Sequence, residues 1–537
     1  MSIKIYKYII ATILIIFLVL LIFTNSINTL IPSRDSGTFL YAGKEILQGK
    51  IPYKDFWEHK TPLIFLINAF ALKLFNGDFW GLWIIELIFL FLSLLLFFIL
   101  TNKIFIFNNS IIGLIFISYY LIKFLEGGNR VEEFAILFQI VILVLFYNSH
   151  NTSKIKSIKI YSFITGVFTA FLFLLRPNLI GIFLSILITN SFLLLKDNYK
   201  KYINNIIFVI LGISLPIISI IVFFSYKSAI IDFFDQTIIF NIIYSDSNIE
   251  KKIISILNFI RTNYNVFILT FIGYILLLKE KKKNIIVTLS SIWLPIEIIF
   301  SSISGREYKH YYLSLLIPLI ILLIYPLNKL FSKLDKITNK NIFKISILNV
   351  FIIISLYFIF FNKEIIKIFI NFDEKKPFDR NFNFRSFLYN NFDEHKDTIS
   401  IIKKETTNYD KIIIWGSEPS LYLISNRVSA SKYFYQFRLF HPNYDVDGHH
   451  INRFIYEVKY NLPKLIIDAS ESTYDKDIGE YSALPPLDKE KMLKWKEKSN
   501  YKNYYILDEL VNFIEENYLF ISKTYHNKWL VYKLNNL

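Results

Sequence analysis

The sequence contains no cysteine among its 537 residues. This absence excludes disulfide bonds, thiolate metal sites and cysteine nucleophiles, although it does not identify a redox compartment. The C-terminal part also lacks a phosphate-binding loop, since Gly416 stands alone after a short apolar run where a dinucleotide fingerprint needs several glycines. We therefore expect neither thiol chemistry nor a glycine-rich nucleotide site.

Apolar residues, in contrast, are abundant. Hydrophobic residues make up 54% of the chain and aromatic residues 18%, and the mean hydropathy is positive. A soluble core could not bury so much apolar surface, which indicates an integral membrane protein. The formal net charge is +16, but the lysines fall in short clusters between apolar runs. A nucleic-acid-binding protein would spread them along one continuous face, so we expect no nucleic-acid partner.

Runs long enough to cross a bilayer predict about eleven transmembrane helices. The first run follows Lys4 and Lys7, is too long for the core of a signal peptide and has no small-residue cleavage site after it. We expect a retained anchor whose N-terminus is cytoplasmic. The predicted spans are 7–31, 79–101, 109–125, 131–147, 158–175, 177–195, 202–225, 264–279, 284–303, 310–328 and 342–362.

The lysine clusters support this count and give an orientation. Counted alternately from a cytoplasmic N-terminus, every predicted cytoplasmic loop carries lysine, as the positive-inside rule requires. An error of one span would reverse the later loops and break the agreement. We therefore predict a multi-pass plasma-membrane protein whose C-terminal part lies outside the cytoplasm. The cytoplasmic lysines are Lys103; Lys154 and Lys156; Lys196, Lys200 and Lys201; Lys281, Lys282 and Lys283; Lys329, Lys333, Lys336 and Lys340.

A change of composition divides the chain into a transmembrane domain, 1–362, and an extracytoplasmic α/β domain, 363–537. Strand-like runs in the second domain alternate with helix-like stretches near 381–403, 450–460 and 503–516. This alternation predicts a small, partly parallel sheet. The expected strands are Lys411–Trp415, Lys464–Asp468 and Trp529–Tyr532.

The predicted outer loop 32–78 gathers charged side chains at the membrane boundary. Its segments 37–48 and 62–75 have amphipathic spacing and are expected to form helices lying at the interface. Asp35 stands beside cations, an arrangement suited to activating an acceptor hydroxyl while positive groups stabilise a departing lipid phosphate. The alternative is that Asp35 merely caps a helix that begins near Ser36.

Short motifs in this loop and later in the chain resemble one family. Arg-Asp-Ser-Gly-x-Phe-x-Tyr stands at 34–41, and Trp-Glu-His-Lys-Thr-Pro-Leu at 57–63. Gly-Arg-x-Tyr-x-His-Tyr follows at 305–311, then Trp-Gly-x-Glu-Pro at 415–419 and Tyr-Leu-Ile-Ser at 422–425. In this order they resemble the lipid-dependent glycosyltransferases of the C superfamily. More narrowly, they resemble the bacterial and archaeal relatives of protein O-mannosyltransferases and of the aminoarabinose transferase that modifies lipid A.

The resemblance implies an inverting transfer of a sugar from a polyprenyl-phosphate donor to a hydroxyl of a protein, lipid or glycan acceptor. The family's catalytic acidic residue in the first outer loop matches Asp35. Many relatives have a second acidic residue beside it, but here that position is Ser36, so Glu58 would have to supply a second carboxylate. Where relatives hold a divalent metal ion, His59 and Glu58 are the nearest candidates, and two ligands fall short of a complete set.

The family analogy also implies that cations bind the donor phosphate and that the C-terminal domain binds the acceptor or shields the active-site mouth. Arginine suits bidentate contact with phosphate best. Arg176 and Lys309 are also cations on the predicted outer side. For these two, the alternative to phosphate binding is that the side chain simply snorkels at the membrane interface. Arg130 has a structural alternative, in which Glu132 and Glu133 pair with it or with another cation to hold the outer loops together. The expected donor-phosphate ligands are Lys60, Arg130, Arg306, Lys309 and His310.

A transporter or flippase of a lipid-linked sugar is the alternative function, because the same hydropathy would permit it. Transporters place ionisable groups or broken helices at mid-membrane, often in two repeated halves. Here the charged residues crowd the outer loops and no internal repeat is visible, which favours the enzyme. Asp232 and Asp235, in a later outer loop, remain open between acceptor contacts and solvated surface.

Overall fold

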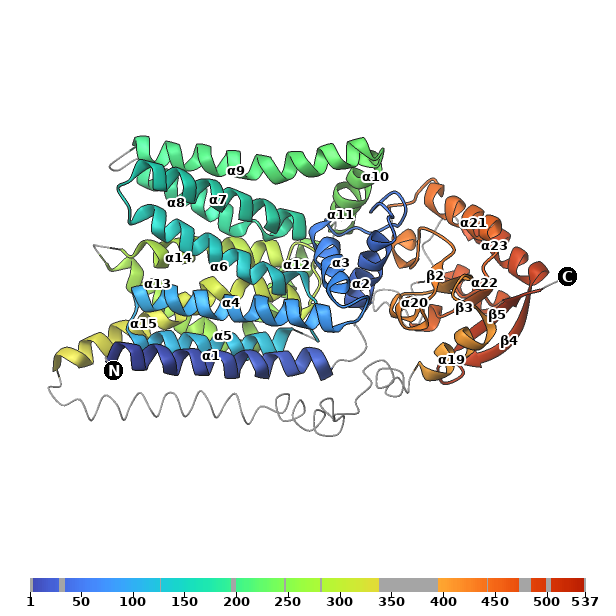
Figure 1. Cartoon of the computed structure of the whole chain (residues 1–537), viewed down its shortest axis with the longest axis horizontal. Coiled ribbons are helices and arrows are strands. Elements are labelled where there is room, and N and C mark those ends of the chain that lie inside the picture. Colours follow the sequence, from blue (N-terminus) through green and yellow to red (C-terminus); the bar gives the residue numbers. More distant parts are fainter. Residues whose placement is uncertain are drawn as a thin grey trace.

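The computed structural model describes residues 3–28, 34–125, 127–194, 199–245, 248–280, 283–337, 395–441, 443–472, 484–498 and 504–535. These residues form a long bundle of apolar helices with a smaller domain at one end, built around a five-stranded sheet (Figure 1). Short helices from the first and middle parts of the chain lie between the bundle and the smaller domain.

The bundle is that of a multi-pass membrane protein, as predicted. Seven helices in the described part of the chain are long and apolar enough to cross a membrane. The predicted spans 177–195, 264–279 and 284–303 coincide with shorter helices, and 342–362 lies outside the described residues, so the total number of spans remains a prediction. The helices at the first ten predicted spans are α1 (Ile3–Asn28), α4 (Trp80–Ile104), α5 (Phe107–Phe124), α6 (Val131–His150), α7 (Ile155–Leu175), α8 (Gly181–Leu194), α9 (Tyr199–Tyr226), α13 (Tyr264–Leu278), α14 (Ile285–Ser301) and α15 (Leu316–Ile337).

Helices α7 and α9 approach each other closely at two glycines. A Cβ atom on Gly166 would lie 2.0 Å from the carbonyl oxygen of Val209, and one on Gly212 would lie 2.0 Å from that of Phe163. Only glycine fits at such a distance. Small residues are used in this way between membrane helices, because apolar side chains gain little by leaving lipid for protein.

The two amphipathic segments of the first loop are helical. They form α2 (Arg34–Leu47) and α3 (Leu63–Leu74), where 37–48 and 62–75 were predicted. Because α2 begins at Arg34, Asp35 lies within its first turn and does not precede the helix as a cap residue would. Their place at a membrane interface remains a prediction.

A second group of short helices follows α9, and Figure 1 shows α10 and α11 near α2 and α3. The last helix of this group, α12, is bent by 94° from α13 and does not continue it. Exposed Ile253 and Leu257 share α12 with buried Ser255 and Phe259, so the helix is amphipathic. The elements are α10 (Ile230–Phe234), a π-helical turn (Asp235–Ile239), α11 (Phe240–Tyr244) and α12 (Ile249–Thr262).

The C-terminal domain contains the predicted partly parallel sheet, with strand order β2-β1-β3-β5-β4. β1 pairs in parallel with β2 and β3, whereas β5 runs antiparallel to β3 and β4. Central β3 is buried at every position, which explains its continuous apolar run. The strands are β1 (Lys411–Trp415), β2 (Val428–Ser429), β3 (Leu465–Asp468), β4 (Tyr518–Thr524) and β5 (Trp529–Leu534).

Five helices accompany the sheet, and two of them confirm the helices predicted near 450–460 and 503–516. Of the stretch predicted near 381–403, only the last residues are described, and they are helical. The proposed domain boundary at 362 also lies outside the described residues. The helices are α19 (Lys396–Glu405), α20 (Ser420–Ser425), α21 (His449–Asn461), α22 (Lys489–Lys498) and α23 (Tyr504–Asn517).

The contact between α7 and α9 can be tested with Gly212→Ala. The added Cβ would clash with backbone, so the helices must separate, and we expect a loss of stability of about 1–3 kcal/mol despite the better helix propensity of alanine. Thermal unfolding of the detergent-solubilised protein measures this loss. Gly113→Ala is the matched control, because its Cβ would meet side-chain atoms and no backbone, the ring of Phe97 at 3.1 Å and Cδ1 of Ile324 at 3.4 Å. Equal melting temperatures for the two variants would contradict the proposed packing.

Candidate active site

Asp35 stands in the first turn of α2, a helix at the end of the bundle that faces the C-terminal domain (Figure 1), and its side chain is 41% exposed. Its Oδ2 atom is 2.9 Å from Nη1 of Arg130 and 4.0 Å from Nε2 of His310. Burial alone would raise the pKa of Asp35, but the charges of Arg130, Lys60, His310 and Arg438 together hold it well below its usual range. Asp35 is therefore ionised at neutral pH and still accessible.

The turn before α6 places Arg130 against Asp35. Gly127, Gly128 and Asn129 all have positive φ angles, of 94°, 86° and 52°, and glycine and asparagine are the residues that adopt this conformation most readily. The side-chain amide of Asn129 donates to Oγ of Ser36, at 2.9 Å. This bond ties the turn directly to the residue after Asp35, so the two charged groups meet in a defined geometry.

Arg176 pairs with Glu132, and its guanidinium lies 3.9 Å above the ring of Tyr311. Glu132 thus pairs with another cation, one of the two partners left open by the sequence, while Arg130 pairs with Asp35. Glu133 accepts backbone N–H groups of the turn before α6, that of Arg130 at 3.4 Å and that of Asn129. Arg176 is accordingly a neutralised, structural cation and not simply a snorkelling side chain.

Glu58 is fully surrounded by donors and is only 1% exposed. Its Oε1 accepts the backbone N–H groups of His59 and Lys60, at 3.0 and 3.1 Å, and its Oε2 accepts the hydroxyl of Tyr435 from the C-terminal domain. Burial would raise the pKa of Glu58, but His59 and Tyr435 lower it to about 2. The carboxylate therefore joins the first loop to the C-terminal domain, and the geometry does not present it to a substrate.

His59 and Glu58 do not form a complete metal site. The Nδ1 atom of His59 is 2.8 Å from Oε1 of Glu58, and burial lowers the pKa of His59 to about 3, so its ring is neutral. Within the described ranges, no group of three or more histidine, aspartate or glutamate residues is arranged to hold a metal ion. The donor oxygens of Glu58 are already occupied, so the residues present do not fit a resident metal.

Lys60 and Arg306 are cations of a different kind, because no carboxylate of the described chain pairs with either. The guanidinium carbon of Arg306 lies 4.6 Å from the centre of the Tyr244 ring, and Arg438 lies 4.8 Å from the same ring. Burial would raise the pKa of Tyr244, but Arg438, Arg306 and Lys60 lower it below its ordinary value. Positive charge is thus in excess beside Asp35.

The remaining predicted phosphate ligands are placed differently. His310 is buried beside Asp35, whereas Lys309 is exposed, and within the described structure no contact joins it to the other cations. Tyr244 and Arg438 were not predicted from the sequence. Neither carries a local motif, and only the tertiary structure brings them to Arg306.

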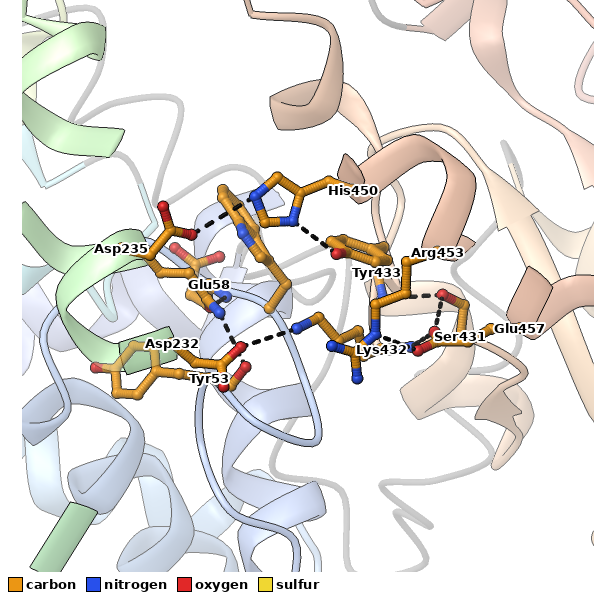
Figure 2. A network of polar contacts seen from close by, with 12 residues as sticks. Tyr53, Glu58, Asp232, Asp235, Ser431, Lys432, Tyr433, His450, Arg453 and Glu457 are labelled. Atoms are coloured by element: carbon orange, nitrogen blue, oxygen red, sulfur yellow. Dashed lines mark hydrogen bonds and ion pairs between the residues drawn. The ribbon is translucent and has the colours of Figure 1, made fainter. Parts of the chain in front are cut away.

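Asp232 and Asp235 contact the C-terminal domain, as Figure 2 shows. Oδ1 of Asp232 is 3.2 Å from Nζ of Lys432, and Oδ2 of Asp235 is 3.6 Å from Nε2 of His450. Asp235 also accepts the hydroxyl of Tyr444, at 2.7 Å. The two acidic residues that the sequence left open therefore lie at the interface between the domains.

Comparison with known proteins identifies the fold. No family model and no curated protein sequence matches the chain. Among solved structures, ArnT from Cupriavidus metallidurans is similar over 97% of both chains, with a TM-score of 0.56 for the apo state and for the form bound to undecaprenyl phosphate, at 8% and 9% identity. An oligosaccharyltransferase from Archaeoglobus fulgidus, solved with zinc and sulfate, matches 86% of this chain and 69% of its own, with a TM-score of 0.47 and 12% identity.

Glu58→Gln should lower the stability of the folded protein by about 3 kcal/mol at pH 7, because folding lowers the pKa of the carboxyl group from 4.5 to about 2. A group whose pKa is lowered on folding stabilises the protein above its unfolded pKa. The difference between wild type and variant should therefore be complete above about pH 4.5 and disappear as the pH falls towards 2.

Thermal unfolding at pH 7, 5 and 3 measures this difference. Glu490→Gln, at an exposed position on α22, is the control and should unfold like the wild type at each pH. A difference between wild type and Glu58→Gln that does not change with pH would contradict the assignment.

Proposed function

We propose, from the fold shared with ArnT, that this protein is an inverting glycosyltransferase. It moves a sugar from a polyprenyl-phosphate donor to an acceptor hydroxyl on the outer side of the membrane. The observation that carries the proposal is the ionised, accessible Asp35 near Lys60, which lies close to the Tyr244 ring together with Arg306; neither cation forms an ion pair with a described carboxylate. One of the similar ArnT structures holds undecaprenyl phosphate, which supports a polyprenyl-phosphate donor.

In the proposed reaction, the acceptor oxygen attacks the anomeric carbon on the face opposite the phosphate. The new carbon–oxygen bond forms as the bond from the anomeric carbon to the phosphate oxygen breaks, and its electron pair stays on the phosphate. The hydroxyl proton passes to Asp35. No covalent sugar–enzyme intermediate is needed, so one carboxylate is sufficient, in agreement with the serine at position 36.

The low pKa of Asp35 affects when the proton moves. A weakly basic carboxylate cannot deprotonate a free hydroxyl in advance, because general-base catalysis is most efficient when the pKa lies near the working pH. It can accept the proton once the attacking oxygen has begun to bond with the anomeric carbon and has become acidic. Until then Asp35 orients the acceptor as a hydrogen-bond acceptor, and Arg130 fixes its position.

The leaving phosphate gains negative charge during transfer, and this is where cations contribute most. Lys60 and Arg306 carry positive charge that is not already used by an ion pair within the described residues, and His310 is close enough to Asp35 to border both substrates. Arg306 is held against the face of Tyr244, an arrangement that leaves its N–H groups free of a carboxylate.

We assign the two domains the roles that the sequence predicted. Residues 1–362 form the transmembrane catalytic domain, and the C-terminal α/β domain lies outside the cytoplasm, where it covers the site and contributes to acceptor binding. The 41% exposure of the Asp35 side chain leaves an approach for an acceptor beside the covering domain. No step is routed through a metal ion, because Glu58 and His59 do not form a suitable ligand set.

Asp35→Asn tests the proposed base. We expect the transfer rate to fall by about a hundredfold to ten-thousandfold, the usual contribution of a general base, with little change in donor KM. The assay uses purified protein, radiolabelled polyprenyl-phosphate hexoses and a membrane extract as the acceptor source. Asp55→Asn, at an exposed position of the same loop, is the control. Full activity of a folded Asp35→Asn protein would refute the assignment, and no transfer by the wild type with any donor would favour the transporter.

Arg306→Ala tests the phosphate contact. Donor KM should rise about tenfold to a hundredfold, because a hydrogen bond to a charged group is worth about 1.5–3 kcal/mol. Lys309→Ala is a closely matched control, since Lys309 lies three residues away on the chain but is exposed, and its KM should stay within about twofold of wild type. Equal effects of the two substitutions would contradict the assignment of Arg306.

A further inference from the structure

Arg438 belongs to the C-terminal domain but lies against residues of the transmembrane domain. It stands in a short 3-10 helix, Phe437–Phe440, and its guanidinium carbon is 4.8 Å from the centre of the Tyr244 ring. Arg306 lies 4.6 Å from that ring. Two arginines from different domains therefore share one aromatic side chain, although like charges repel.

Aromatic rings hold the Arg438 guanidinium in place. Besides Tyr244, the rings of Phe240 and Phe437 lie 5.9 and 5.3 Å from its central carbon. An aromatic face attracts a cation without occupying its N–H groups. A carboxylate partner, in contrast, would both neutralise the charge and use the donors. The aromatic setting thus fixes Arg438 in position, with the Tyr244 hydroxyl as a further contact, and no carboxylate of the described chain forms an ion pair with it.

Two nitrogens of Arg438 have no visible function within the domain itself. Nε and Nη1 are shielded from solvent, and no described residue accepts a hydrogen bond from either. Arg427, in the same domain, behaves as a structural arginine should, donating to Thr406, Asn408 and Ser425. Buried donors without acceptors are rare and unfavourable. This indicates that an acceptor from outside the described chain receives the hydrogen bonds of Nε and Nη1 of Arg438.

The surroundings define that acceptor as an anion. Lys60 and Arg306 are the neighbouring cations, and neither has a carboxylate partner in the described structure. Asp35 and Glu58, the acidic groups nearest to Arg438, are already paired with Arg130 and hydrogen-bonded to Tyr435. A phosphate group, which accepts several hydrogen bonds and suits the planar fork of arginine, would satisfy all three cations at once.

We propose that Arg438 is the third cation of the donor-phosphate site, so that this site is complete only when the C-terminal domain is docked on the transmembrane bundle. The inference rests on the proposed function and adds a regulatory element to it. Arg438 is a binding residue supplied across a domain interface, and the position of the domain decides whether the lipid phosphate meets two cations or three.

The contacts that dock the domain support this coupling. Tyr435 stands three residues before Arg438, and its hydroxyl donates to Glu58. Glu58 in turn stands two residues before Lys60 in the first loop. Lys432 contacts the bundle twice, through its carbonyl oxygen, 2.9 Å from the backbone nitrogen of Trp57, and through its ammonium group, 3.2 Å from Asp232 (Figure 2). The segment that docks the domain is therefore the same segment that delivers Arg438.

The third cation should matter more for the product than for the donor. The donor is a phosphodiester with one negative charge, whereas the lipid phosphate released by transfer is a monoester that carries up to two. Because positive charge is most effective where negative charge develops, Arg438 stabilises the breaking bond more than the bound donor. A deletion of its charge is expected to lower the transfer rate as well as the affinity.

Binding of undecaprenyl phosphate to the full-length purified protein tests the proposal. Arg438→Gln should weaken binding about tenfold to a hundredfold, and Arg438→Lys, which keeps the charge but loses the planar fork, should lie between Gln and wild type. Undecaprenol, which has the same chain but no phosphate, should bind equally to all variants. Arg261→Gln removes an exposed arginine and serves as the control for net charge.

A variant of the interface tests the coupling itself. Asp232→Ala removes the partner of the Lys432 ammonium group without touching the cations, and it should weaken phosphate binding in wild type but not further in the Arg438→Gln background. Additive effects of the two substitutions would refute the coupling.

The outcomes also separate this inference from the proposed function. If a folded Arg438→Gln protein binds undecaprenyl phosphate as tightly as the wild type, the inference is wrong. The enzyme assignment then still stands, provided that the wild type binds the lipid and transfers sugar. Failure of the wild type to bind undecaprenyl phosphate would overturn both. Melting temperatures without lipid establish that the variants fold. If Arg438→Gln does not fold, the undecaprenyl phosphate affinity of Arg438→Lys is compared with that of the wild type instead, and an unchanged affinity overturns the inference.

Discussion

The structure depends on keeping unlike charges close together at the end of an apolar bundle without letting all of them neutralise one another. Of two ion pairs, the one between Asp35 and Arg130 joins the first loop to the turn before α6, and the one between Glu132 and Arg176 joins α6 to the end of α7. Such pairs are stable only where the geometry is fixed, because charges at a membrane boundary are costly to desolvate. The glycine-rich turn before Arg130 supplies that geometry, and the cations outside these pairs are the ones that we propose as ligands of the donor phosphate.

The C-terminal domain takes part in the same arrangement. Glu58, which the family resemblance implied as a second carboxylate, accepts hydrogen bonds from backbone N–H groups and from Tyr435. Its negative charge therefore serves to anchor a domain. Glu58 lies one position from His59 and two from Lys60, so the loop that carries the proposed phosphate ligand Lys60 is also the loop that the C-terminal domain contacts.

Much of the architecture could be predicted because local patterns of apolar and polar residues determine it. Apolar runs located the helices of the bundle, and the alternation of strands and helices predicted the partly parallel sheet. Strand β4 was missed because α23 ends at Asn517 and the strand begins at Tyr518, with no glycine or proline between them to mark the change. The motifs drew attention to Asp35, Lys60 and His310, which lie together in the structure, while their roles stay predictions.

What could not be predicted is which partner each charge selects. The sequence offers Arg130 two acidic neighbours, Glu132 and Glu133, and only the fold shows that Arg130 pairs with Asp35 while Glu132 pairs with Arg176. Arg438 and Lys309 also show that a local motif does not decide which cation lies beside the others. Lys309 belongs to a recognisable motif yet is exposed, whereas Arg438 has no motif and reaches the site because a distant segment folds over it.

The right-angled bend between α12 and α13 gives the bilayer itself a part in this site. If α13 stands across the membrane, α12 lies along its surface, with Ile253 and Leu257 in the acyl boundary and Lys251 among the headgroups. The hydroxyl of Ser255 donates to the carbonyl oxygen of Arg306 at 3.3 Å, so α12 is tied to the segment that carries Arg306. On the proposed function, the membrane surface therefore sets the height at which the donor phosphate meets Arg306, and this height follows bilayer thickness.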